Sequence, residues 1–161
     1  MKQDQEAAAE VQLVTFRLEQ EEFALDINQV REVLRMAPVT LLPQSAHFIE
    51  GVINLRGEII PVIDLRKRFE LPPKERDEQT RIIIVEIEEQ KVGLIVDLVT
   101  EVLRLPSEAI KPPPERVVNV QNDLIRGIGK IEKRLLIILN LTKILDAEEK
   151  IALREVIPGV E

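Results

Sequence analysis

The chain has 161 residues, a net charge of −7 at pH 7, 45% hydrophobic residues and only 2% aromatic residues. This composition lacks the basic footprint and the stacking side chains of a nucleic-acid-binding protein, and the absence of cysteine excludes a disulfide framework or a thiolate zinc site. Neither a signal peptide nor a membrane span is indicated, so we expect a cytoplasmic protein without direct membrane insertion.

The first part of the chain predicts a hairpin followed by a helical turn. Alternating apolar and polar residues predict strands over residues 14–18 and 23–27. Asn28 can accept a backbone N–H at a helix start, so we expect it to cap a short helical turn. That turn would place Val30 and Val33 on one face.

A second hairpin is predicted further along. Glycine permits the positive φ of a tight turn, so Arg56-Gly57 is expected to join strands over 52–55 and 58–63. Pro61 has no N–H for a ladder, which predicts that its strand lies at an edge or a bulge. Asp64 is expected to cap the helical turn that follows.

The second half of the chain predicts the same elements again. Strands over 81–87 and 91–96 repeat the opening hairpin. Asp97 aligns with the first cap and is expected to open a helical turn containing Val99 and Val102. An apolar strand over residues 135–139 and an amphipathic C-terminal helix complete the prediction.

Two echoed segments reveal an internal repeat. The sequence of residues 25–35 is echoed at 94–104, an offset of 69 (94 − 25), and residues 51–55 are echoed at 127–131, an offset of 76 (127 − 51). Units of about 70 residues bury only a marginal core alone. We therefore predict a mainly β fold of two pseudo-symmetric five-stranded barrels packed on a shared hydrophobic core, with short helices and a C-terminal helix.

The predicted division places one β-barrel subdomain at residues 11–79 and a second at 80–145. The C-terminal helix and tail then occupy residues 146–161. We expect the three parts to form one domain.

Catalytic motifs are missing from the sequence, and the single histidine is His47. The strongest enzymatic alternative is an aspartic hydrolase with one carboxylate from each half. That class needs Asp-Thr-Gly or Asp-Ser-Gly in both halves, and neither tripeptide occurs. The repeat instead pairs Asp26 with Ile95 and Asp64 with Asn140. We expect no enzymatic activity, no metal and no cofactor.

The stretch His47–Leu65, H-F-I-E-G-V-I-N-L-R-G-E-I-I-P-V-I-D-L, resembles the central signature of the CheW family of bacterial chemotaxis coupling proteins. Two further landmarks, around Leu25 and around Gly93, follow in family order, so the similarity covers about residues 11–150. This resemblance implies two five-stranded SH3-like barrels and a non-catalytic adaptor without a cofactor. A small-barrel nucleic-acid-binding protein is the alternative function.

The resemblance also implies the partners. The adaptor would couple methyl-accepting chemoreceptors to the histidine kinase CheA, whose regulatory domain shares the fold, at membrane-associated receptor arrays. A receptor's signalling tip is a helical hairpin, which suits an apolar groove between two barrels. Four valines at equivalent repeat positions are the groove candidates, with membership of the interfacial core as their alternative: Val30, Val33, Val99 and Val102.

Polar interaction roles carry over to Arg56 and Glu32. Three glycines carry over as positions where added bulk would spoil the surface: Gly51, Gly57 and Gly93. At the equivalent turn of the second half, Glu132-Lys133 replaces Arg56-Gly57. Only the first hairpin is therefore expected to dock a partner.

Overall fold

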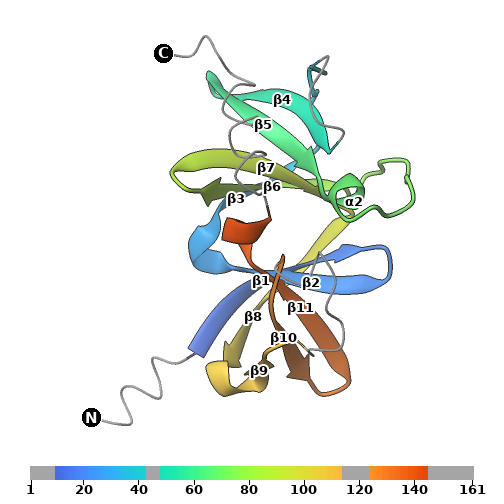
Figure 1. Cartoon of the computed structure of the whole chain (residues 1–161). Helices are drawn as coiled ribbons and strands as arrows, with labels where there is room; N and C mark the ends of the chain where they lie inside the picture. The colour runs from blue at the N-terminus through green and yellow to red at the C-terminus, as the bar shows by residue number, and fades with distance from the viewer. Residues whose placement is uncertain (1–9, 43–47, 114–123, 145–161) are drawn as a thin grey trace.

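The computed structural model describes residues 10–42, 48–113 and 124–144. Within these residues strands predominate and form two sheets, one above the other in Figure 1. The expected mainly β fold is confirmed. The predicted C-terminal helix within 146–161 lies outside the described residues, as does His47.

The elements follow the order that the sequence predicts. Strands of the first repeat are β1 (Glu10–Leu18), β2 (Glu21–Asp26), β3 (Val30–Arg35), β4 (Ile49–Leu55) and β5 (Glu58–Asp64). Strands of the second repeat are β6 (Arg81–Ile87), β7 (Gln90–Val96), β8 (Leu98–Pro106), β9 (Ile110–Lys111), β10 (Ile125–Ile131) and β11 (Arg134–Leu139). The helical elements are all short: η1 (Ile27–Gln29), α2 (Leu65–Arg68), η2 (Ser107–Ala109) and η5 (Leu141–Lys143).

Each sheet combines strands of both repeats. The upper sheet of Figure 1 has the order β3-β6-β7-β5-β4, and the lower sheet has the order β8-β1-β2-β11-β10-β9. When β1 to β5 are matched to β6, β7, β8, β10 and β11, the two orders become identical except for the additional β9. The repeats thus exchange their opening hairpins, and a boundary between residues 79 and 80 divides the sequence repeats but not the two sheets.

The equivalence extends to the strand register. In the upper sheet, Val62 of β5 lies opposite Gly93 of the parallel strand β7. In the lower sheet, Ile138 of β11 lies opposite Ala24 of the parallel strand β2. These pairs match at the offsets of 76 (138 − 62) and 69 (93 − 24) found in the sequence. The pseudo-symmetry therefore holds residue by residue in the strand pairing.

The helical turns predicted over Val30–Leu34 and Val99–Leu103 are wrong, because both segments are strands, β3 and β8. Residues of β3 alternate between half-buried and exposed, as in a pleated strand, and β-branched valine suits that setting. Both strands carry a one-residue bulge at equivalent positions, Arg31 in β3 and Thr100 in β8. Pairing with β6 and β1 fixes the extended conformation.

The predicted caps have mixed outcomes. Asp64 caps α2 as expected, since its Oδ1 accepts the N–H of the second helical residue at 3.0 Å. In the first turn Asp26, not Asn28, is the cap, and its Oδ1 accepts the Asn28 N–H at 2.9 Å. Asn140, expected to be a cap because it aligns with Asp64 in the repeat, precedes η5 but makes no capping hydrogen bond through its side chain. Asp97 instead accepts the backbone N–H of Glu19 at 3.0 Å.

Pro61 lies in an interior strand and not at an edge, but the pairing of its strand with β4 does contain a bulge, the other expected feature, between Ile49 and Gly51. Its neighbour on β4, Val52, exchanges both backbone hydrogen bonds with Thr40 at 2.9 Å and thus turns them away from β5. On the other side of β5, pairing with β7 begins only at Val62. The missing N–H of proline therefore removes no ladder hydrogen bond.

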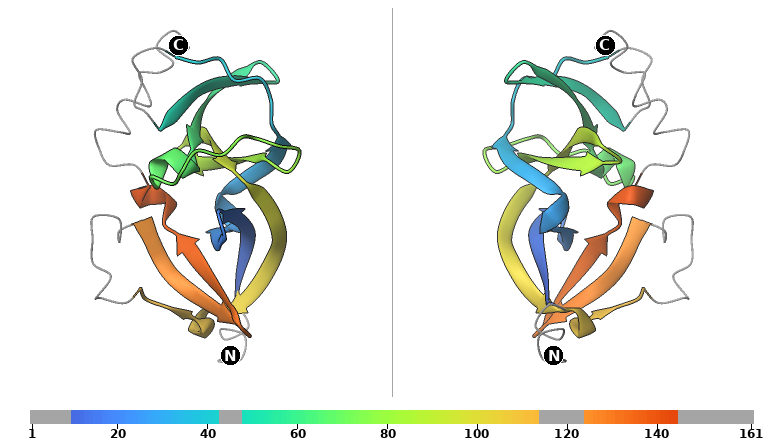
Figure 2. Two further views of the ribbon diagram at one scale, coloured as in Figure 1. Left: turned by 90° about the vertical axis from the view of Figure 1, so that its right-hand side faces the viewer. Right: turned by 90° about the vertical axis from the view of Figure 1, so that its left-hand side faces the viewer.

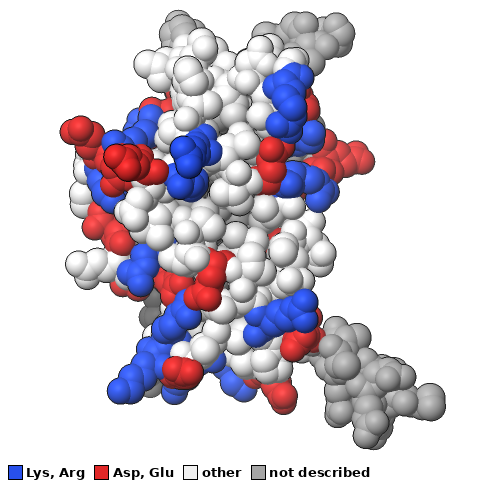
Figure 3. Space-filling model, turned by 180° about the vertical axis from the view of Figure 1, so that it is seen from behind, with Lys and Arg blue, Asp and Glu red and all other residues white. Residues whose placement is uncertain are grey.

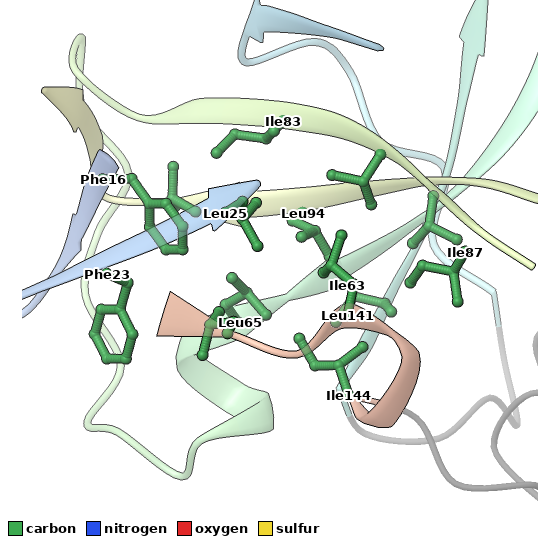
Figure 4. Packing of buried hydrophobic residues seen from close by; sticks show 14 of the residues in the cluster. Phe16, Phe23, Leu25, Ile63, Leu65, Ile83, Ile87, Leu94, Leu141 and Ile144 are labelled. Atoms are coloured by element: carbon green, nitrogen blue, oxygen red, sulfur yellow. The ribbon is translucent and has the colours of Figure 1, made fainter. Parts of the chain in front are cut away.

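The shared core between the two sheets is confirmed. Figure 4 shows aliphatic and aromatic side chains from both repeats meeting there, including Phe16, Leu25, Ile63, Leu65, Ile83, Leu94, Leu141 and Ile144. In both views of Figure 2, α2 and η5 lie at the level where the sheets meet. Burial of each such side chain contributes about 2 kcal/mol. This interfacial cluster is therefore a large part of what holds the two sheets together.

Each sheet also encloses a smaller apolar cluster. The upper cluster consists of Ile53, Ile60, Val62, Ile82, Ile84 and Ile95. The lower cluster consists of Leu13, Ala24, Leu105, Leu136 and Ile138. The molecule thus has two sheet interiors and one interface, as expected for two small barrels packed together.

Candidate protein-docking surface

The β4–β5 hairpin presents Arg56 at its tip. Arg56 and Gly57 have φ angles of 52° and 87°. Positive φ at both central positions is the pattern of a two-residue type I′ turn, which glycine favours. The side-chain Oδ1 of Asn54 accepts the Gly57 N–H at 2.8 Å. This hydrogen bond stabilises the turn and so fixes the position of the Arg56 backbone.

Arg56 bonds to Glu32 on β3, which brings together the two polar residues singled out in the sequence. The Nη2 atom of Arg56 donates to Oε2 of Glu32. The Arg56 side chain is 70% exposed and that of Glu32 is 33% exposed. The hydrogen bond to Glu32 and the charge of that carboxylate raise the pKa of Arg56 above its ordinary value. The pair therefore presents an oriented, permanently charged guanidinium to solvent.

A similar ion pair in the lower sheet, whose arginine stands at the repeat position of Glu58 and not of Arg56, was missed from the sequence. Glu101, offset by 69 from Glu32, accepts from Arg134 at 2.9 Å. Arg134 also donates from Nε and Nη2 to the two oxygens of Glu22, at 3.2 and 2.7 Å. Thr100 adds a hydrogen bond to Glu22 at 3.1 Å. Aligning Glu32 with Glu101 through the repeat would have been the sequence signal for this pair.

The electrostatics of the two arginines differ. Burial raises the pKa of Glu22, but hydrogen bonds from Arg134 and Thr100 outweigh it and hold that pKa below its ordinary value. Arg134 divides its donors between two carboxylates and is 40% exposed. In the described part of the chain, Arg56 has an ion pair with Glu32 alone. Arg56 therefore retains more donor capacity for a partner.

The four candidate valines fall into two classes. Val30 and Val99 are half-buried and pack against the interfacial cluster, as the core alternative expects. Val33 and Val102 are 41% and 52% exposed. The structure therefore places one valine of β3 and one of β8 at the surface, and their partners beneath it.

Exposed apolar residues also recur at equivalent positions. Val33 matches Val102 at the offset of 69, and Ile59, 46% exposed, matches Leu135, 59% exposed, at the offset of 76. Large side chains of this kind at the surface commonly mark interaction sites when they gather. Each sheet therefore offers apolar contacts of its own.

The three candidate glycines lie in different environments. Gly51 and Gly93 are buried. A Cβ on Gly51 would lie 2.1 Å from the carbonyl oxygen of Thr40, and one on Gly93 would lie 2.8 Å from Cγ2 of Ile82. Added bulk at these two positions would first disturb packing. At Gly57 no atom lies within 4 Å of the Cβ position, so this glycine faces open space.

The charge pattern is that of a mixed surface. In Figure 3, acidic and basic side chains are interspersed over the visible face, with no continuous basic patch. Among residues 10–42, 48–113 and 124–144, no group of three or more His, Asp or Glu side chains could hold a metal ion. No helix in the same residues has the length and apolar character needed to cross a membrane.

Comparisons with known proteins show the family to which this chain is similar. The CheW-like domain model matches residues 12–149. The chemotaxis protein CheW of Klebsiella aerogenes is 38% identical over 138 residues, covering 86% of this chain and 83% of that protein. CheW of Bacillus subtilis is 38% identical over 136 residues, covering 84% and 87%.

A solved structure is also similar. The crystal structure of the scaffolding protein TtCheW from Thermoanaerobacter tengcongensis matches with a TM-score of 0.80 and 42% identity, covering 86% of this chain and 94% of that chain. The family model, the two relatives and the solved structure thus indicate the same family over most of the chain. The chain belongs to the CheW-like family, the non-catalytic scaffold proteins of bacterial chemotaxis.

Proposed function

We propose that this protein is an adaptor that couples methyl-accepting chemoreceptors to the histidine kinase CheA, acting in the cytoplasm at membrane-associated receptor arrays. Membership of the CheW-like family supports this proposal. The observation that carries it is the exposed Arg56, oriented by Glu32 on a fixed turn and 70% accessible to a partner.

The kinase's regulatory domain is proposed to dock at the β4–β5 hairpin. A guanidinium can bind a partner's carboxylate or carbonyl oxygens through several donors at once. Because Glu32 already restrains Arg56, binding orders less of its side chain and loses less conformational entropy. The open space at Gly57 lets a partner approach the turn closely, and this supports its role at the surface.

The receptor's helical hairpin is proposed to contact the exposed valines Val33 and Val102. Each is the exposed member of its pair, while Val30 and Val99 pack into the interfacial cluster below. Helices bind through apolar side chains on one face, which suits exposed aliphatic residues on β3 and β8. Gly51 and Gly93 are proposed to act indirectly, because they allow the close packing inside the upper sheet that holds its strands in place.

Isothermal titration against the isolated regulatory domain of CheA, at low and high salt, tests the kinase contact. Arg56→Ala should weaken binding by about tenfold, as expected for a central charged contact. Arg126→Ala is the matched control, since Arg126 is 45% exposed and pairs with Asp26 at 3.4 Å in the lower sheet. No binding by the folded wild-type chain would refute kinase docking. Equal losses in both variants would show that only net charge matters.

Co-sedimentation with receptor signalling domains in nanodiscs tests the second contact. Val102→Ser should reduce receptor binding without lowering the melting temperature, because the side chain is 52% exposed. Val99→Ser should lower the melting temperature, because its side chain packs against the core. Unchanged receptor binding by Val33→Ser and Val102→Ser together would exclude the valine surface.

A further inference from the structure

The two repeats are interlocked. Every strand pairing that attaches an opening hairpin to the rest of its sheet crosses from one repeat to the other: β1 with β8, β2 with β11, β6 with β3 and β7 with β5. A buried ion pair adds to these contacts, with Arg66 of α2 donating to Asp97 at 2.6 Å. All of these contacts need one first repeat and one second repeat. None of them requires both repeats to belong to the same chain.

The covalent connection between the repeats is the segment between α2 and β6, residues 69–80. Most of it is exposed, from residue 72 to residue 79. Leu71 packs partly against the interfacial cluster. Beyond that residue, polar contacts hold the segment to the domain. Its conformation therefore depends on few interactions, unlike the sheets.

Those polar contacts form a small cluster, which we call the clasp and define by Pro72, Lys74 and Arg76. Arg76 bonds to Glu50 at 3.0 Å and to Asp64 at 3.2 Å. The Pro72 carbonyl accepts from Nε and Nη2 of Arg66 at 3.1 and 2.7 Å, and Lys74 lies 3.9 Å from Asp97. A cavity of about 270 Å³ lies beside the clasp and is lined mostly by charged side chains, among them Arg66, Lys74 and Arg76. The clasp thus fixes the course of the segment along the first repeat, and Lys74 also faces Asp97 of the second repeat.

We propose that residues 72–79 are a hinge through which two copies of this chain can exchange whole repeats, and that the clasp favours the closed monomer. In the exchanged dimer, the first repeat of each copy pairs with the second repeat of the other, and every sheet contact is retained. Exchange of identical elements is an accessible route to a dimer because only the hinge differs. With an intact linker, closure within one chain is favoured by its high effective concentration.

Shortening the hinge gives the sharpest test. Deletion of residues 73–78 joins Pro72 directly to Gln79, removes Lys74 and Arg76 of the clasp, and strains closure of the chain on its own second repeat. The variant should elute at twice the monomer mass by light scattering, with the circular dichroism spectrum of the wild type. A folded monomer would overturn the proposal.

A cleavable hinge decides the question if the shortened chain does not fold. A protease site placed over residues 74–77 is cut only after the full chain has folded. The two fragments should remain together in a one-to-one complex in native buffer, because strand pairing and the interfacial cluster hold them without the linker. Separation of the fragments without denaturant would overturn the interlock and the proposed exchange.

The clasp is tested by refolding at low and high protein concentration. Arg76→Gln should raise the dimer fraction severalfold at high concentration, because it removes the bonds to Glu50 and Asp64. Lys91→Gln is the matched control, since Lys91 pairs with Glu58 at 3.1 Å outside the hinge. Equal dimer fractions in the two variants would refute the role of the clasp.

Discussion

The upper and lower sheets share strand order and register but are filled differently. The upper interior is wholly aliphatic, whereas the lower sheet has Thr15 and Gly129 at the positions of Ile84 and Ile53. Thr15 is fully buried, and its hydroxyl bonds to the backbone of Glu101 at 3.0 and 3.1 Å. Backbone pairing is thus kept across the repeat, while the volume and polarity of the interiors have diverged.

The surfaces of the two sheets diverge in the same way. Both join an arginine of the second hairpin to the equivalent glutamate, Arg56 to Glu32 above and Arg134 to Glu101 below. The lower arginine is also bonded to Glu22 and so ties three strands together. We infer that the lower pair serves mainly to close its sheet, while the upper pair is free to take a partner.

The largest expected effect separates the two equivalent glycines of β4 and β10. Gly51→Ala places a Cβ 2.1 Å from the Thr40 oxygen at a φ of 154°, and should destabilise by about 4 kcal/mol. Gly127→Ala meets Cγ2 of Ile110 at 2.8 Å and the carbonyl oxygen of Lys111 at 2.9 Å without a positive φ, and should destabilise by about 2 kcal/mol. Urea unfolding followed by circular dichroism measures both. Equal losses of stability would mean that the surrounding structure adapts equally well to a Cβ at either glycine.

The next effect concerns equivalent polar positions at the junction of the sheets. Asp97→Ala leaves the buried Arg66 without its partner at 2.6 Å and should destabilise by about 3 kcal/mol. Asn28→Ala, at the exposed equivalent position, should change stability by less than about 0.5 kcal/mol. Denaturant midpoints compare the two. A small effect of Asp97→Ala would show that Glu19 and Pro72 suffice to hold Arg66.

A smaller difference is expected between the two arginines. Arg134→Ala removes contacts to two carboxylates and should destabilise by about 1 kcal/mol, since the side chain is partly exposed. Arg56→Ala should leave the unfolding midpoint unchanged, and should weaken kinase binding more than Arg134→Ala does. Thermal unfolding and titration of both variants measure the contrast. The reverse pattern would assign docking to the lower hairpin.

The smallest effect is a dependence on pH. Burial raises the pKa of Glu50, but hydrogen bonds from Lys67 and Arg76 hold it below its ordinary value, as Arg134 and Thr100 do for Glu22. A lowered folded pKa contributes stability that is present above the unfolded pKa and lost as pH falls through the folded one. Each glutamate should contribute less than about 1 kcal/mol at neutral pH.

Acid titration of stability checks this effect. Glu50→Gln and Glu22→Gln should each flatten the fall in unfolding free energy on acidification. If neither variant changes the fall in unfolding free energy at acidic pH, other carboxylates account for that fall. A larger change in Glu22→Gln than in Glu50→Gln would place more of the acid sensitivity in the lower sheet.

Local patterns in the sequence predicted the hairpins and the Arg56-Gly57 turn correctly, because turn chemistry and two-residue alternation act over a few neighbours. The same local view was wrong for β3, where Val30, Val33 and Leu34 have helical spacing. Pairing of β3 with β6 decides that segment, and β6 begins 46 residues (81 − 35) after β3 ends. Arg134 was missed because its partners Glu22 and Glu101 meet it only through the exchanged strands.

The sequence by itself determined the duplication, the mainly β character, the shared apolar core and the family, since each depends on residue type and spacing along the chain. The tertiary structure alone decided that the repeats exchange hairpins, that Pro61 lies inside a sheet, and that Arg56 pairs with one carboxylate while Arg134 pairs with two. Alternation shows that a strand has an inner face, but not which strand lies beside it. That choice depends on contacts between distant segments, which are made only when both repeats fold together.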